Sequence, residues 1–359
     1  MSSTTMSQRD TKGRSRSDRD RPRALRQWLV VAARRITAAA ISLFGVITIT
    51  FIATRMIGNP VELLLGNNAT QEGRDALIRE LGLDQPLYIQ FGHFLGELAR
   101  LDFGRSTVTM RPVIDDVVSR LPATLELVGV AMVLTILIGV PLGLKAGARP
   151  GSFVDRVVGW ITRIGAALPS FWVGLLLILL LTYTWRIFPT PLGIDIGVTR
   201  RTGFLLIDSL LAGSFPALLR SLALITLPAV TLALNSLPAV LQIVRNTTSS
   251  IVTSEYIRTA KASGIQKKLL NRTYVFRNVL GPLLPVIAMS ASNKIGNSAL
   301  VEVVFLWPGI GQYAVNAMNN LDYAPVLAVV LITAVFYIIG YLIAEILQAI
   351  FDPRVRTQR

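Results

Sequence analysis

The sequence contains no cysteine and only one histidine, His93. Disulfide bonds, thiolate nucleophiles and cysteine metal sites are therefore excluded, and a single imidazole cannot form a histidine metal cluster. We interpret His93 as an ordinary surface side chain. The chain is also expected to hold no metal.

Sequence motifs that carry chemistry are missing as well. There is no Gly-x-x-x-x-Gly-Lys-Ser/Thr run to cradle phosphates, no His-Glu-x-x-His and no Gly-x-Ser-x-Gly nucleophile elbow. We therefore expect no catalytic residue and no cofactor in this chain. If the chain takes part in active transport, the energy must enter through another polypeptide.

Charged residues are scarce, at 16% of the chain, whereas hydrophobic residues make up 52% and the mean hydropathy is +0.54. Soluble domains carry about 25% charged residues. The composition therefore indicates a polytopic protein of the lipid bilayer. The net charge of +15 is explained by basic residues at one membrane face, and it does not favour a nucleic-acid partner.

Long apolar runs predict six membrane-spanning helices, since a span needs ~20 mostly apolar residues. They cover residues 36–57, 124–144, 154–183, 217–244, 279–304 and 325–350. Pro169 interrupts the third run and predicts a kink there, because proline removes one backbone hydrogen bond. We expect an all-α membrane protein in which 1–27 is a disordered cytoplasmic tail and 28–359 is the transmembrane domain.

The loops change sign across the membrane. Segment 58–120 carries nine acids against five bases before Arg120, whereas loop 245–277 carries seven bases against one acid, Glu255. Basic loops stay in the cytoplasm. This predicts that both termini are cytoplasmic and that 58–120 is an extracytoplasmic segment, with helices at 72–81 and 87–101.

Further features fall near the span ends. A short amphipathic stretch at 312–321 is expected outside, with Trp307 and Tyr313 at the lipid–water interface. Glu126 and Glu345 are expected to be interface anchors.

The basic cytoplasmic loop contains a short helix-prone stretch with three small residues, Ala260, Ala262 and Gly264. Glycine can end a helix at positive φ and leaves room for a partner surface. We therefore predict a short helix that ends at Gly264 and docks a cytoplasmic partner.

Polar residues form a stripe on the fifth span, within a sector of ~140° of the helix. They are Ser290, Asn293, Lys294, Asn297 and Ser298. Such groups are costly against lipid, about 2.5–3.5 kcal/mol for a central lysine. One interpretation is the wall of a substrate path, in which Lys294 attracts an anionic group such as a peptide carboxylate. The alternative is hydrogen bonding between helices, with Lys294 snorkelling outward. Asn235 and Gln242 share one face of the fourth span and are also candidates for the path.

Several motifs together resemble one family. They are LGLDQP at 81–86, DFGRS at 102–106, RLPATLE at 120–126, LPSFW at 168–172, YIRTAKASG at 256–264 and WPG at 307–309. From about residue 30 to 356 the chain resembles the permease subunits of bacterial ABC importers of the peptide/nickel class, and most of all the first permease of a dipeptide or oligopeptide system. The stretch at 256–264 is similar to the EAA loop of that family, with Arg258 where the general loop has glutamate.

The resemblance implies a type I importer fold in the bacterial inner membrane. It implies a heterodimer with a second, similar permease, two cytoplasmic ATPase subunits that carry ATP and Mg, and an extracytoplasmic substrate-binding protein. Substrate would move by alternating access. The coupling residues would be Glu255, Tyr256, Arg258, Thr259, Ala260, Ala262 and Gly264.

Two alternatives remain open. Within the class, an importer of nickel chelates, glutathione or an opine-like molecule is barely distinguished, because the binding protein sets most of the specificity. Outside the class, a channel or secondary transporter working alone is disfavoured, because no inverted repeat is visible and membrane acids are few.

Overall fold

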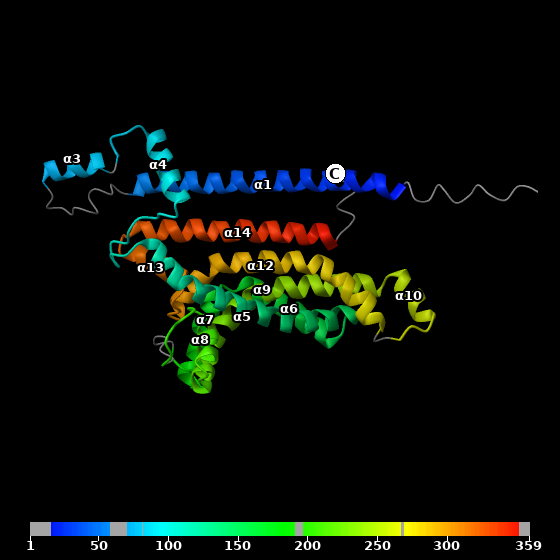
Figure 1. Ribbon diagram of the computed structural model, residues 1–359. Helices are drawn as coiled ribbons and strands as arrows, with labels where there is room; N and C mark the ends of the chain where they lie inside the picture. The colour runs from blue at the N-terminus through cyan, green and yellow to red at the C-terminus, as the bar shows by residue number, and fades with distance from the viewer. Residues whose placement is uncertain (1–15, 58–69, 81, 191–196, 267–268, 352–359) are drawn as a thin grey trace, which may run out of the picture.

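The computed structural model describes residues 16–57, 70–80, 82–190, 197–266 and 269–351. Within those residues the regular secondary structure is helical, apart from one isolated β-bridge between Arg105 and Pro112. The long helices run side by side, with α3, α4 and α13 at one end of the bundle and α10 at the other (Figure 1). The beginning of α1 and the end of α14 lie toward the end that carries α10.

The helices have the following bounds. In the first half they are α1 Arg16–Ile57, α3 Gln71–Glu80, α4 Leu87–Ala99, α5 Val113–Ala148, α6 Phe153–Ala167, α7 Ser170–Leu177 and the π-helix η1 Ile178–Thr184. In the second half they are α8 Leu205–Leu211, α9 Phe215–Val252, α10 Glu255–Ala262, the π-helix η2 Leu270–Phe276, α12 Arg277–Val304, α13 Ile310–Asn319 and α14 Tyr323–Phe351.

Five of these helical segments are long and apolar enough to cross a membrane, and a sixth is counted when a bent pair is taken as one span. The pair is Phe153–Ala167 with Ser170–Thr184, which meet at 106°. Pro169 lies in the break, so the expected disruption is confirmed, although the chain turns more sharply than a kink. The all-helical class is confirmed for the described residues.

The short helices of segment 58–120 and of the stretch at 312–321 also agree with the sequence. The stretches expected at 72–81 and 87–101 correspond to α3 and α4, and the stretch at 312–321 corresponds to α13. Gly82, at φ 62°, lies in the turn that separates α3 from α4. Residues 58–69 and 81 of this segment lie outside the described part of the chain.

The N-terminal tail differs from the expectation. Helix α1 begins at Arg16, so residues 16–27, which were expected to be disordered, are helical. Residues 1–15 lie outside the described residues. The physical reason is that α1 is one continuous helix whose apolar part anchors its polar start, and helix propagation costs less than nucleation.

Three glycines allow helices α5 and α9 to approach closely. Gly139, Gly143 and Gly147 recur every four residues on α5 and face α9. A Cβ atom would lie 2.9 Å from Val240 Cγ1 at the first position, 2.8 Å from Val244 Cβ at the second and 2.6 Å from Thr248 Cβ at the third. Small residues at this spacing let two membrane helices pack backbone to side chain. We call these contacts the glycine seam between α5 and α9.

Helix α1 lies at the edge of the bundle beside α14 (Figure 1). At its outer part, Phe44 and Phe51 pack edge-on against Phe91 of α4, with ring centroids 5.8 and 5.2 Å apart. Elsewhere along α1, Arg35 pairs with Glu345 of α14 at 3.2 Å. Glu345 therefore has an ion-pair partner within the protein.

Candidate coupling helix and polar membrane face

Helix α10 is the short helix expected in the basic cytoplasmic loop. It ends in a Schellman arrangement: the N–H of Gly264 donates to the carbonyl of Lys261 at 3.1 Å, and the N–H of Ile265 donates to the carbonyl of Ala260 at 3.2 Å. Gly264 has φ 78°, and nothing lies within 4 Å of the position its Cβ would occupy. The predicted glycine terminus at positive φ is confirmed.

The two faces of α10 have different roles. Ile257 and Ala260 are buried and pack in an apolar cluster with residues of α5, α9 and α12, among them Val244 and Val279. The opposite face of the helix is exposed and consists of Glu255, Tyr256, Arg258, Thr259, Lys261 and Ala262. The helix is thus attached to the spans on one side and open on the other.

One coupling residue is placed differently from the expectation. Ala260 was expected to permit close docking of a partner, but only 9% of it is exposed and it faces the bundle. Its small side chain serves the approach of α10 to the spans instead. Gly264 and Ala262 remain on the open side.

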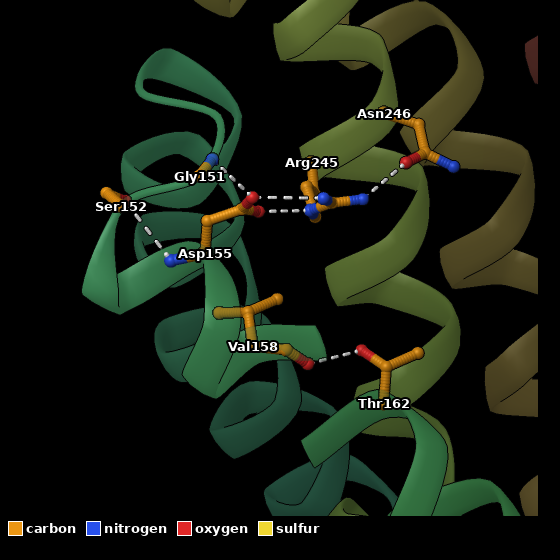
Figure 2. A network of polar contacts seen from close by, with 7 residues as sticks. All are labelled: Gly151, Ser152, Asp155, Val158, Thr162, Arg245 and Asn246. Atoms are coloured by element: carbon orange, nitrogen blue, oxygen red, sulfur yellow. Dashed lines mark hydrogen bonds and ion pairs between the residues drawn. The ribbon is translucent and has the colours of Figure 1, made fainter. Parts of the chain in front are cut away.

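An ion pair that was not expected from the sequence connects α6 to α9 (Figure 2). The guanidinium of Arg245 binds both carboxylate oxygens of Asp155, with 3.1 Å from Nη2 to Oδ2. The same carboxylate accepts a 2.9 Å hydrogen bond from the N–H of Gly151, and the N–H of Asp155 donates to Ser152 Oγ at 3.2 Å. Arg245 was counted only as a basic loop residue, because no local signal connects positions so distant in the sequence.

The five residues that the sequence offered as candidates for the substrate path separate into two groups. Asn293 and Asn297 on α12 and Asn235 and Gln242 on α9 are exposed on the surface of this chain. Amide side chains exposed on membrane spans need water or a protein partner, because lipid offers them no hydrogen bonds. These four amides therefore do not face hydrocarbon, and we call the surface that they mark the polar face.

Lys294 does not belong to that surface. It is 2% exposed, and its ammonium donates a hydrogen bond to the carbonyl oxygen of Leu232 on α9. It lies between α9 and α12 rather than snorkelling outward. The inter-helix hydrogen bond weighed from the sequence describes this contact.

A cavity of about 480 Å³ lies where α6, α7 and α9 meet, at the bent pair. It is lined by apolar side chains, including Trp160, Ile164 and Leu234, and Asn235 contributes an amide to the wall. Asn235 thus lies both on the exposed side of α9 and in the wall of this cavity.

A buried carboxyl group to which the sequence assigned no role joins three helices. Glu302 on α12 is 0% exposed. Its Oε1 accepts hydrogen bonds from Thr124 of α5 at 2.8 Å and from Ser298 at 2.7 Å, and its Oε2 accepts one from the N–H of Gln312 at 3.0 Å. Gln312 is the third residue of α13, so Glu302 satisfies one of the free N–H groups at the start of that helix.

We expect replacement of Glu302 by alanine to lower the stability of the protein by about 3 kcal/mol or more, because each buried donor left unpaired costs ~1–3 kcal/mol. The thermal midpoint of the detergent-purified protein measures this. The matched control is Glu345→Ala, which removes a partly exposed carboxylate from its pair with Arg35. Equal midpoints for the two variants would contradict the role given to Glu302.

Three residues that were expected at the lipid–water interface, two aromatic and one acidic, are buried instead. Trp307 is 1% exposed and donates from Nε1 to the carbonyl of Ala123 at 2.8 Å. Tyr313 is 5% exposed and donates to Asp116 at 3.0 Å; burial, then this hydrogen bond, raises the pKa of Tyr313 above its ordinary value. Glu126 is 7% exposed and accepts from the N–H groups of Leu205 and Leu206. All three hold the interior together, because their polar atoms find partners there.

The fold and these sites define a class of protein. It is a multi-span helical membrane protein with an exposed short helix at one end and a polar face on two spans. Among the residues that the structure describes, no group of acids and histidines could hold a metal ion.

Comparison with known proteins places the chain in a family. Residues 139–357 match the family described as the binding-protein-dependent transport system inner membrane component, and residues 28–128 match its N-terminal region. The chain belongs to this family. The family expected from the motifs and the inner-membrane location are thereby confirmed.

Relatives of known name cover almost the whole chain. The probable D,D-dipeptide transport system permease protein of Escherichia coli strain K12 is 34% identical over 315 residues, 87% of this chain and 93% of that protein. The di/tripeptide permease protein of Pseudomonas aeruginosa strain UCBPP-PA14 is 32% identical, with 91% and 98% covered. The oligopeptide permease protein AppB of Bacillus subtilis strain 168 is 32% identical, with 90% and 98% covered.

Proposed function

We propose that this chain is a permease subunit of an ATP-driven importer for dipeptides or oligopeptides. The observation that carries the proposal is α10, a short helix with one face packed on the spans and the other open. The names of the relatives support the peptide substrate, since three of them are named as permease proteins of D,D-dipeptide, di/tripeptide or oligopeptide transport systems.

The proposed topology has six spans with both termini in the cytoplasm. In this arrangement the bent pair α6–α7 counts as the third span. The start of α1, the end of α14 and α10 lie toward one end of the bundle, as this topology requires (Figure 1). The basic loop that contains α10 would be cytoplasmic, and α3 and α4 extracytoplasmic.

Coupling would work by pushing on α10. Glu255, Tyr256, Arg258, Thr259, Ala262 and Gly264 would meet one of two partner ATPase subunits, which carry ATP and Mg. Ile257 and Ala260 would pass the movement to α9 and α12, because they are buried against those helices and close-packed interiors transmit displacement. The Asp155–Arg245 pair would make α6 follow α9.

The translocation path would form along the exposed amides. Asn235, Gln242, Asn293 and Asn297 would face a second, similar permease, and substrate would pass between the two by alternating access. In the conformation seen here, Lys294 would hold α12 to α9 through its hydrogen bond to the carbonyl of Leu232. It would line the path only if those helices separate. An extracytoplasmic binding protein would deliver the substrate.

The test is reconstitution of the purified complex in proteoliposomes with its binding protein. We expect ATP-dependent accumulation of radiolabelled dipeptide, and no accumulation with the lone chain. Competition by a nickel chelate, glutathione or an opine-like molecule, with no effect of peptides, would reassign the substrate within the class. Flux through the lone chain without nucleotide would overturn the proposal.

A further inference from the structure

The segment from α8 to the start of α9 forms a hairpin that joins the core of the bundle at Leu205. Helix α8 ends at Leu211, the chain turns through Gly213 at φ 63°, and α9 begins at Phe215. We call residues 205–222 the outer hairpin. Figure 1 shows that its α8 part projects to one side of the bundle, near the end that carries α13.

The inner side of the outer hairpin is polar. Asp208, Ser209 and Ser221 are 2%, 0% and 1% exposed, and the two serine hydroxyls lie 2.9 Å apart. Asp208 accepts hydrogen bonds from the N–H groups of Arg201, Thr202 and Gly203 and from Thr202 Oγ1.

The outward side of the outer hairpin is apolar. It consists of Ile207, Leu210, Leu211, Phe215, Leu219 and Leu222, which are between 42% and 67% exposed. A helix beside water buries its apolar side and exposes its polar side. The outer hairpin does the opposite, and its polar groups are fully used inside. Its outward surface is therefore built for apolar surroundings.

The residues around this surface indicate which surroundings these are. Arg220 is exposed within the hairpin, and Trp185 and Arg201 are exposed in the sequence that precedes it. In the described part of residues 185–222 the one acid is Asp208, which is buried. Indole rings and cationic side chains at the edge of an apolar surface are typical of the lipid–water interface, where guanidinium groups meet lipid phosphates.

We propose that the outer hairpin lies in the extracytoplasmic leaflet of the bilayer, with its apolar surface in the hydrocarbon edge and its arginines at the headgroups. In this position the hairpin anchors the extracytoplasmic end of α9, and Asn235 and Gln242 lie farther along the same helix. The side of the membrane rests on the topology proposed above, whereas the contact with lipid does not.

The absence of cysteine makes the test direct, because single cysteines can be introduced without removing any. Leu211→Cys and Phe215→Cys are labelled with bimane and placed in nanodiscs of phosphatidylethanolamine and phosphatidylglycerol. Quenching is measured with nitroxide-labelled lipid and with aqueous iodide. The controls are Ile41→Cys on the exposed side of α1 and Thr107→Cys in the exposed outer loop.

We expect nitroxide lipid to quench both hairpin probes at least half as strongly as the Ile41→Cys probe, and iodide to quench them at least threefold less than the Thr107→Cys probe. These results should hold for the lone chain and for the assembled complex. Iodide quenching equal to that at Thr107→Cys would overturn the proposal. Loss of lipid quenching only in the complex would instead assign the surface to the second permease.

Orientation is tested separately in whole cells. A membrane-impermeant maleimide added outside should label Thr107→Cys if the proposed topology holds. A hairpin probe that is quenched by lipid, together with Thr107→Cys unlabelled from outside, would refute the topology and retain the lipid contact.

Discussion

Replacing Gly147 by valine is expected to disrupt the packing of α5 on α9. A Cβ atom there would overlap the carbonyl oxygen of Arg245 and lie 2.6 Å from Thr248 Cβ and 3.1 Å from Ser249 N. Backbone atoms cannot move aside as a flexible side chain can, so the helices must separate. Overpacking costs about 1–3 kcal/mol in ordinary cores and more against backbone. We expect the thermal midpoint of the purified protein to fall by roughly 6 °C or more.

The matched control is Gly129→Val on the same helix. Gly129 has nothing within 4 Å of its Cβ position and is exposed. Both variants introduce the same side chain into α5, so helix propensity cancels between them. If the two midpoints agree within 2 °C, the close packing at the glycine seam does not stabilise the protein as the structure indicates.

The Gly264→Trp substitution is expected to abolish co-purification of the ATPase subunits while membrane insertion stays normal. An indole at this point would cover the open end of α10, where the structure leaves free space. We expect the ATPase recovered in a pull-down to fall more than tenfold. Band intensities of the affinity-purified complex measure it, with the amount of permease in the membrane fraction as the reference.

Two further variants distinguish the effect of side-chain size at position 264 from the effect of backbone strain. Gly264→Ala carries the strain of positive φ, about 1–3 kcal/mol, without the bulk, and should keep most of the ATPase. Gly151→Trp places the same indole at another glycine with φ 79° and open space, in the loop between α5 and α6. Normal ATPase recovery with Gly264→Trp, or equal loss with Gly151→Trp, would remove the coupling role from α10.

Local signals predicted the breaks and ends of the helices well. Pro169 produced the break between α6 and α7, and Gly264 a helix end at φ 78°. Each depends on the chemistry of one residue: a missing N–H in proline or a missing Cβ in glycine. Such effects act on the residue's own backbone, so they can be read without knowing what lies nearby.

Side-chain direction was predicted less well. Ala260 was expected to face a partner, and Trp307, Tyr313 and Glu126 the interface, yet all four are buried in the protein. Polar residues near span ends suit either the headgroup region or a buried partner. For Glu126 the partners are the N–H groups of Leu205 and Leu206, which lie far away in the sequence. No periodicity reveals such a partner.

The amino-acid sequence alone determined the family, the helical class, the positions of the apolar segments and the short helix at 255–262. Only the tertiary structure decided that Lys294 and Glu302 are internal, that Asp155 pairs with Arg245, and that the outer hairpin turns its apolar side outward. The reason is that lipid and protein interior are both apolar, so hydropathy shows that a helix enters the membrane without showing which side meets lipid. That choice depends on which helices become neighbours, as the close packing of α5 on α9 at the glycine seam illustrates.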